Sequence, residues 1–402
     1  MVIAAEPVQR RVLKVLAVSQ VLGSSGVATG LALSALVAVS LSGVEAVGGF
    51  AQTCAVVGAA VSALPAARLA QRAGRRPVLV LCYGVGAVGA LLAAVAVVLG
   101  SWRLLLPSLV LFGAAGSANL AARYAGADLA APHERARSLA LVVWAATVGA
   151  VAGPNLAAPA GRVVAGLGLP EGSGAYLTSA VLFGAAALVV LRFLRPDPLV
   201  LARGSAAEPV ETGPRGRVWR SLPASGRLAV VGIAVSHGVM VGLMAMAPVH
   251  VGHAGGSLSL VGVLVSLHVA AMYGLSPLVG RLVDRWGGGA VQALGAALLV
   301  AAAALVGSAA GDDPVRLGVG LVLLGLGWSA GVIAGSALLT QVVAGARRTA
   351  AQGLSDLCMN CAGALGGVLA GLVVTAWSYA ALGLLAGFVV LPMLVVAVLR
   401  VR

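Results

Sequence analysis

Charged residues are scarce in this chain. Only 9% of its 402 residues are Asp, Glu, Lys or Arg, whereas 60% are hydrophobic and the mean hydropathy is +1.05. A water-soluble domain carries about a quarter charged residues, so this composition has too few to cover a solvated surface. The shortage excludes a soluble protein and leaves the lipid bilayer, where apolar side chains face outward.

The signatures of several other functions are also missing. No GxxxxGK sequence followed by Ser or Thr occurs, which argues against ATP as the energy source. No metal-ligand cluster and no nucleophile beside a base stands out, so we expect no metal, no cofactor and no enzymatic reaction. Cys358 and Cys361 have CxxC spacing without a second ligand pair, so we interpret them as small packing residues rather than metal ligands.

Long apolar runs are what the chain has in abundance. A spanning helix needs about 20 apolar residues, and twelve runs reach that length. They cover about residues 12–40, 46–66, 77–99, 102–126, 137–160, 175–195, 226–248, 258–281, 289–309, 315–343, 351–375 and 377–399. The roughly ten-residue alternating segments of a membrane barrel are absent. We therefore predict an all-α integral membrane protein with twelve transmembrane helices.

The basic residues are unevenly distributed between the two sides. With both termini on one side, 23 of the 26 Lys and Arg residues fall on that side, and only Arg103, Arg162 and Arg316 fall on the other. Cytoplasmic loops carry this excess of positive charge. This distribution therefore predicts that both termini are cytoplasmic. It also explains the net charge of +14, which then does not indicate a nucleic-acid surface.

The chain divides into two halves. Residues 196–225 are rich in Pro, Gly, Ser and charge, which is typical of a linker. They separate residues 1–195 from residues 226–402, each with six predicted spans.

Two motifs recur at nearly the same spacing in the two halves. "ARLAQRAGRR" at 67–76 corresponds to "GRLVDRWGGG" at 280–289, an offset of 213 (280 minus 67). Gly149 and Gly153 correspond to Gly363 and Gly367, an offset of 214 (363 minus 149). The coincidence indicates a duplicated six-helix unit, an arrangement found in transporters.

The chain resembles the major facilitator superfamily over nearly its whole length. The family's G-x-x-x-D-R-x-G-R-R loop is matched in the second half by Gly280, Asp284, Arg285 and Gly287. The first-half loop keeps the basic and glycine positions as Arg72, Gly74, Arg75 and Arg76. It has Ala67 and Gln71 where the family has Gly and Asp.

The fifth run resembles a motif of the drug/proton antiporter branches. Gly149-x-x-x-Gly153-Pro154 matches G-x-x-x-G-P, but Ala157 and Ala158 stand near the two glycines that usually follow. Glycines permit close helix contact, and a proline inside a helix permits bending. The resemblance implies two pseudo-symmetric six-helix bundles that work by alternating access, in a chain expected to be monomeric.

His237 is the leading candidate for a proton carrier. It lies near the middle of its run, and Met240 and Met244 share its helix face. Imidazole titrates near neutral pH and methionine provides an adaptable apolar wall. The alternative is a neutral histidine bonded to a neighbouring helix, with ordinary methionine packing. For His268, also near mid-membrane, the packing interpretation is favoured.

The basic loops and three further charged residues predict a cytoplasmic gate. Arg123 and Asp128 lie near the cytoplasmic end of the fourth run, and Asp356 lies just inside the eleventh. Asp356 is either a proton carrier or a gate residue, and its shallow depth favours the gate. Because Gln71 brings no charge, we expect Asp128 or Asp356 to supply a carboxylate to Arg72 or Arg75.

The remaining polar candidates for a substrate cavity are neutral. They are Gln20, Ser24 and Ser25 of the first run, Asn119 of the fourth, and Trp328 and Ser329 of the tenth. With no deep Arg or Lys, we expect a neutral, apolar or weakly cationic small molecule as substrate.

The favoured function is proton-coupled efflux from the inner membrane of a bacterium. Its alternatives are proton-coupled import of a neutral nutrient, and an intramembrane enzyme such as an acyltransferase. The enzyme ranks lowest because His237, His268 and Asp356 lie at different depths in the membrane.

Overall fold

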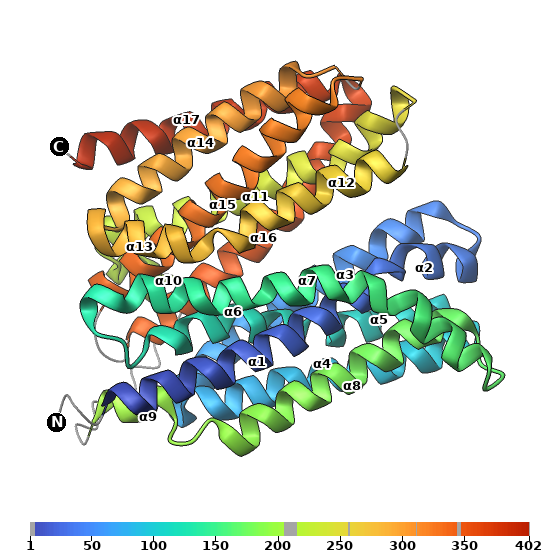
Figure 1. The fold of residues 1–402 in the computed structure, drawn as a ribbon, viewed down its shortest axis with the longest axis horizontal. Helices are drawn as coiled ribbons and strands as arrows, with labels where there is room; N and C mark the ends of the chain where they lie inside the picture. Colours follow the sequence, from blue (N-terminus) through green and yellow to red (C-terminus); the bar gives the residue numbers. More distant parts are fainter. Residues whose placement is uncertain (1–4, 205–214, 256–257, 311, 344–346, 402) are drawn as a thin grey trace. The chain divides into compact units, whose positions relative to one another are not determined.

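The computed structural model describes residues 5–204, 215–255, 258–310, 312–343 and 347–401, and every regular element in these ranges is helical (Figure 1). Twelve helical segments of the described chain are long and apolar enough to cross a membrane. This confirms the predicted all-α, multi-pass architecture.

The helices of the first half end at the predicted linker. They are α1 (Ala5–Ala32), α2 (Ser34–Ser42), α3 (Glu45–Ala73), α4 (Arg75–Val98), α5 (Trp102–Phe112), α6 (Ala114–Ala127), the 3₁₀ turn η1 (Pro132–Glu134), α7 (Arg135–Ala165) and α8 (Glu171–Phe193). Two short helices, α9 (Pro198–Arg203) and α10 (Arg215–Ser221), lie within the linker, whose residues 205–214 fall outside the described chain.

The second half has six further spans. They are formed by α11 (Ala224–His253), α12 (Leu258–Val269) with the π-helical turn η2 (Ala270–Gly274) and α13 (Ser276–Trp286), α14 (Gly288–Ser308), α15 (Pro314–Val342), α16 (Arg347–Ala376) and α17 (Tyr379–Val401).

Three of the predicted runs are interrupted helices. The first breaks at Leu33, the fourth at Gly113, and the eighth contains η2. A Cβ atom at Gly113 would overlap the carbonyl of Ala55 in α3, so glycine allows the two helices to touch there. Hydropathy does not report such breaks because they leave the apolar composition unchanged.

The chain forms two compact units. Unit 1 comprises Met1–Ala130, Ala145–Pro214 and Gly345–Leu357, and unit 2 comprises Ala131–Trp144, Arg215–Ala344 and Cys358–Arg402. Two long helices are therefore divided. The first turns of α7 belong to unit 2, and the first turns of α16 belong to unit 1.

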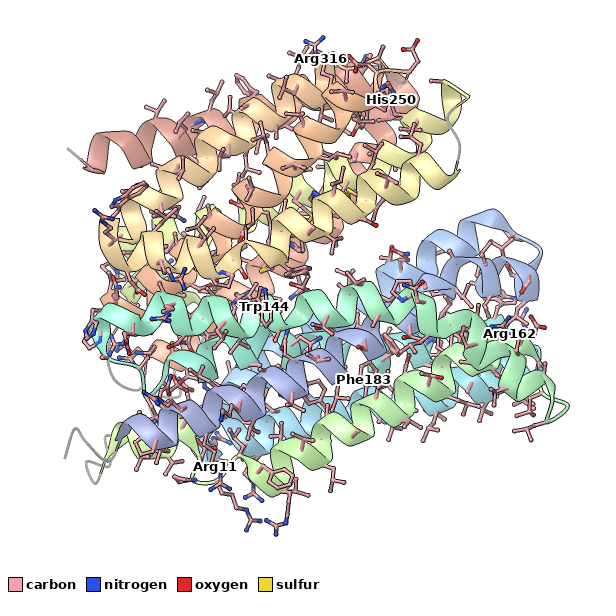
Figure 2. The ribbon with its side chains drawn as sticks, in the orientation of Figure 1. Arg11, Trp144, Arg162, Phe183, His250 and Arg316 are labelled. Atoms are coloured by element: carbon pink, nitrogen blue, oxygen red, sulfur yellow. The ribbon has the colours of Figure 1, made fainter. Side chains whose placement is uncertain are left out.

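Aromatic and small residues form the interior of unit 1. The rings of Phe112 and Phe183 meet edge to face, with centroids 5.1 Å apart, and Phe183 lies between the helices in Figure 2. Arg11 and Arg162, which the charge bias assigns to opposite sides of the membrane, lie at opposite ends of this unit (Figure 2).

Helix α15 is the central element of unit 2. In its most apolar window 78% of the residues are buried, whereas the other spans of the described chain reach 50% at most. Large apolar side chains elsewhere are exposed, such as Leu384 (76%) and Phe388 (73%) of α17. This outer apolar surface is what a lipid-embedded bundle requires.

Candidate functional site

A glycine turn and a buried ion pair occupy one end of unit 1. Gly74 has a φ of +93° and joins α3 to α4, a conformation that favours glycine. Arg75 follows and is 3% exposed. Its Nε lies 2.8 Å from Oδ2 of Asp128 and its Nη2 lies 3.3 Å from Oδ1. This two-point pair supplies Arg75 with one of the two carboxylates that the sequence predicted.

The first turns of α16 bring a second set of polar groups into unit 1. Nη2 of Arg75 donates to Oε1 of Gln352 at 2.6 Å. Nη2 of Arg123 donates to Oδ1 of Asp356 at 2.7 Å, and its guanidinium lies 4.8 Å from the ring centre of Tyr124. Asp356, like Arg123, is almost fully buried. Charges so deeply buried require such partners.

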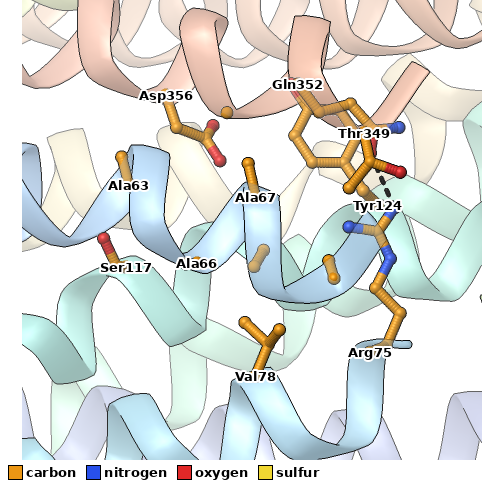
Figure 3. Close-up of a pocket in the computed structure, with 13 residues that line it drawn as sticks. Ala63, Ala66, Ala67, Arg75, Val78, Ser117, Tyr124, Thr349, Gln352 and Asp356 are labelled. Atoms are coloured by element: carbon orange, nitrogen blue, oxygen red, sulfur yellow. Dashed lines mark hydrogen bonds between the residues drawn. The ribbon is translucent and has the colours of Figure 1, made fainter. Parts of the chain in front are cut away.

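A small cavity lies among these groups (Figure 3). Arg75, Gln352 and Asp356 line it together with Ser117 and a wall of alanines, and Figure 3 shows the bond from Arg75 to Gln352. The cavity volume is ≈ 10 Å³. That is about the space of one water molecule, and the polar lining offers the partners that a buried water needs.

Two pairs of small residues occupy corresponding places in the two units. A Cβ atom at Gly353 of α16 would overlap Cβ of Ala67 of α3. In unit 2, a Cβ atom at Gly280 of α13 would lie 2.7 Å from Cβ of Ala140 of α7. Both pairs are related by the offset of 213 (280 minus 67; 353 minus 140). The glycine missing at position 67 therefore stands on the opposite helix.

The acidic residue of the repeated loop has a defined role in unit 2. Asp284 accepts hydrogen bonds from the backbone N–H groups of Ala136 (3.1 Å) and Arg137 (3.0 Å). These belong to the first turn of α7, where a carboxylate offsets the helix dipole. The turn after α13 contains Gly287 at φ +85°, which matches Gly74. The repeat thus encodes the same glycine turn twice.

Gln71 is buried beside the linker. It is 4% exposed, and its carbonyl accepts from Nη1 of Arg203 at 2.6 Å. Partial burial lowers the pKa of Arg203, and the charge of Arg75 acts in the same direction. Arginine nevertheless stays charged near neutral pH, so it stabilises the C-terminal end of α3. Arg72 and Arg285 are exposed.

Asp197 is a functional candidate that the sequence analysis missed. Its Oδ2 accepts from the backbone N–H of Arg76 at 2.7 Å, and its Oδ1 accepts from that of Leu199 at 2.9 Å. Arg76 in turn donates from Nε to the carbonyl of Leu191 at 3.0 Å. Asp197 precedes Pro198, which is the helix-start signal that would have identified it.

In unit 2, the structure joins two of the predicted cavity residues. Nε1 of Trp328 donates to Nδ1 of His237 at 3.0 Å, and Gly363 of α16 packs against the imidazole. His237 is half-buried, whereas Trp328 is 4% and Met240 is 7% exposed. Met244 is half-buried on the same helix.

Tyr273 was not predicted but lies against Trp328, with ring centroids 5.5 Å apart at 78°. Sequence spacing does not reveal this contact because Tyr273 sits in the π-helical turn. His268 is 2% exposed and its Nδ1 lies 2.9 Å from the carbonyl of Leu321. Ser329 is completely buried.

The neutral polar residues of unit 1 lie on neighbouring helices. The hydroxyl of Tyr83 donates to Oδ1 of Asn119 at 2.8 Å, and both side chains pack against Gly23 of α1. Gln20 and Ser24 are 6% and 9% exposed on the same helix. Tyr83 was missed because a tyrosine in an apolar run carries no distinctive spacing.

The glycine motif of α7 packs directly on α1. A Cβ atom at Gly149 would lie 2.5 Å from the backbone N of Ser25, and one at Gly153 would lie 2.8 Å from the carbonyl of Ser25. Only glycine permits this approach. α7 continues as one helix through Pro154.

Comparisons with known proteins agree with this architecture. The family model described as Major Facilitator Superfamily matches residues 15–332 and 242–402. An uncharacterized MFS-type transporter of Bacillus subtilis (strain 168), YdeG, is 37% identical over 393 residues, covering 97% of this chain and 91% of that protein. The riboflavin transporter RfnT of Brucella anthropi is 31% identical over 354 residues, covering 87% of this chain and 85% of that protein.

Solved structures show the same fold at low sequence identity. The human organic anion transporter MFSD10 (TETRAN) has a TM-score of 0.77 at 19% identity, covering 97% of this chain and 99% of that one. The proton:xylose symporter XylE has a TM-score of 0.72 at 16% identity, covering 96% and 95%. The chain belongs to the Major Facilitator Superfamily of membrane transporters.

Proposed function

We propose that this transporter is a proton-coupled secondary transporter of a bacterial inner membrane, which works alone by alternating access. Residues 1–195 and 226–402 are the two halves that move, and the cytoplasm is on the side of both termini. The observation that carries the proposal is the buried Arg123–Asp356 pair of 2.7 Å, which binds the first turns of α16 into unit 1.

In this proposal the polar cluster of unit 1 is the latch of the cytoplasmic gate. We define the latch by Arg75, Arg123, Asp128, Gln352 and Asp356. Removing one partner of a buried ion pair costs about 3–5 kcal/mol because an unpaired charge remains. The latch therefore stabilises one conformation strongly and yields only when its charges are satisfied in another way.

His237 is proposed to carry the proton. Its imidazole is half-buried at mid-helix, and its hydrogen-bonding partner Trp328 is neutral. A histidine charge change near neutral pH suits a carrier that loads on one side and unloads on the other. An ionisable side chain is costly at membrane depth, and residues of this kind are commonly functional.

The substrate is proposed to be small and uncharged or weakly cationic, and the favoured direction is efflux. The polar candidates at mid-membrane, including Gln20, Asn119 and Trp328, carry no fixed charge that would neutralise a phosphate or carboxylate. Met240 and Met244 supply polarizable apolar contacts for varied ligands.

Import of a neutral nutrient is the second candidate. It is favoured by the 31% identity to the riboflavin transporter RfnT over most of both chains. A flat, polar but uncharged ring system agrees with a neutral lining as well as a hydrophobic drug does.

Transport in cells separates the two directions. Cells that produce the protein should accumulate less of a fluorescent cationic dye than cells that produce the His237→Ala variant, if the protein exports. Import would be supported instead if the two kinds of cells held equal dye levels and the cells with the unchanged protein took up labelled riboflavin faster than those with His237→Ala. Equal dye levels and equal riboflavin uptake would contradict both candidates.

Proteoliposomes test the coupling. A pH gradient imposed without ATP should drive uptake of the dye or of riboflavin, and collapsing the gradient should stop it. Uptake at an unchanged rate without the gradient would remove the proton from the mechanism.

A further inference from the structure

The bond between Trp328 and His237 fixes the position of a proton. The indole N–H is a donor only, so the atom that receives it at 3.0 Å, Nδ1 of His237, must carry a free electron pair. The neutral imidazole then has its proton on Nε2, which lies on the side of Gly363, 2.9 Å from where a Cβ atom of that residue would be.

The indole of Trp328 also contacts a second helix. Its other neighbour is Tyr273, edge to face at 5.5 Å. Tyr273 belongs to η2, and the backbone of this turn packs closely on α15, where a Cβ atom at Gly325 would lie 2.9 Å from the N atom of Met272. Trp328 therefore links the imidazole on α11 to the π-helical turn, and such turns occur often at functional sites.

We propose that Trp328 is a positioning residue for His237, which holds the neutral imidazole and is released when Nδ1 takes up a proton. The inference rests on the proton role proposed above for His237. A protonated imidazole donates from both nitrogens, so Nδ1–H and the indole N–H become two donors facing each other.

Protonation is thus converted into a movement. A buried N–H without an acceptor is unfavourable, so the indole or the imidazole must turn away. The indole cannot turn without disturbing its edge contact with Tyr273 in η2. A charge on His237 therefore changes the packing of α11, α15 and the eighth span together.

The surroundings of His237 contain few other titratable groups. The sequence has no Asp, Glu, Lys or Arg in the inner parts of α11 and of the neighbouring helices α12 to α13, α15 and α16. These parts are residues 228–249, 258–280, 317–342 and 358–376. Besides His237 itself, the titratable side chains in these stretches are those of Cys358, Cys361, His268 and Tyr273. Along α16 the nearest carboxyl group is that of Asp356, which bonds to Arg123 in unit 1.

Fluorine NMR on the purified full chain tests the proposal without measuring transport. All 6 tryptophans are labelled as 5-fluorotryptophan, and the Trp328 signal is assigned from the spectrum of Trp328→Phe, or of Trp328→Tyr if the first variant does not fold. The signal is followed from about pH 5 to 8, the range of histidine titration. His237→Asn is the key variant, because an amide oxygen still accepts from the indole but takes up no proton.

We expect the Trp328 signal to move with pH in the wild type and in His268→Asn. In His237→Asn it should stay at its high-pH position throughout. A wild-type signal that does not move, or one that moves equally in His237→Asn, overturns the proposal. If the signal behaves as expected but transport needs no pH gradient, the proposed coupling fails and the positioning role stands.

Discussion

Replacing Gly353 by alanine tests how closely α16 must pack in unit 1. The added Cβ would overlap Cβ of Ala67 and would lie 3.2 Å from the carbonyl of Ala63. Neither atom can rotate away, because both are attached directly to the backbone of α3. Overpacking costs about 1–3 kcal/mol, and the overlap here places the cost at the upper end.

Helix propensity works against this penalty. Alanine is favoured over glycine inside a helix by about 1 kcal/mol. The net loss for Gly353→Ala is therefore about 2 kcal/mol, or roughly 30-fold in the equilibrium between packed and unpacked states. We expect a lower midpoint of thermal unfolding in detergent and slower transport.

Two variants make the test specific. A Cβ at Gly371, farther along α16, would meet no atom of the described chain within 4 Å, so Gly371→Ala should leave the midpoint unchanged or raise it. Ala67→Gly combined with Gly353→Ala recreates the arrangement of Gly280 and Ala140 in unit 2 and should restore stability. If Gly353→Ala behaves like Gly371→Ala, or if Ala67→Gly does not rescue it, the packing argument is refuted.

Three further predictions concern charge. Asp356→Asn leaves Arg123 buried without its carboxylate and should lower stability by about 3–5 kcal/mol in thermal unfolding, with partial recovery in the exchanged pair Arg123→Asp/Asp356→Arg. Asp284→Asn removes a half-exposed charge that faces the start of α7, so it should lower stability by only about 0.3–1 kcal/mol. A larger loss of stability in Asp284→Asn than in Asp356→Asn would contradict this reasoning. Green fluorescent protein fused after Arg402 should fluoresce because we expect that end in the cytoplasm, and a dark fusion of normal abundance would reverse the topology.

The span pattern was predictable because it depends on composition. A helix in lipid satisfies its own backbone hydrogen bonds and needs about 20 apolar residues to cross the bilayer. Such a run of apolar residues is visible in the sequence. The glycine turns at Gly74 and Gly287 were visible for a similar reason, since their conformation restricts the residue type. The contact of Asp128 with Arg75 is one of the pairings that the charge missing at Gln71 predicted.

Contacts between distant positions were less predictable. The close packing of Gly353 on Ala67 joins residues 286 positions apart (353 minus 67), although the offset of 213 between the halves indicates it. The π-helical turn around Tyr273 leaves hydropathy unchanged, so the edge contact with Trp328 is not visible in one sequence.

Thiol labelling tests the central claim, that the latch holds one end of the transporter closed. Ala66 lines the cavity beside Arg75 and Asp356 and is 8% exposed. In a background without the 4 native cysteines, Ala66→Cys should react slowly with a membrane-impermeant thiol reagent, while Arg72→Cys reacts fast.

Adding Asp356→Asn should raise the labelling rate of Ala66→Cys at least tenfold, since about 1.4 kcal/mol already shifts an equilibrium by that factor. The rate at Arg72→Cys should not change. An unchanged rate at Ala66→Cys in a folded Asp356→Asn variant would contradict the claim that the Arg123–Asp356 pair of the latch holds this end closed.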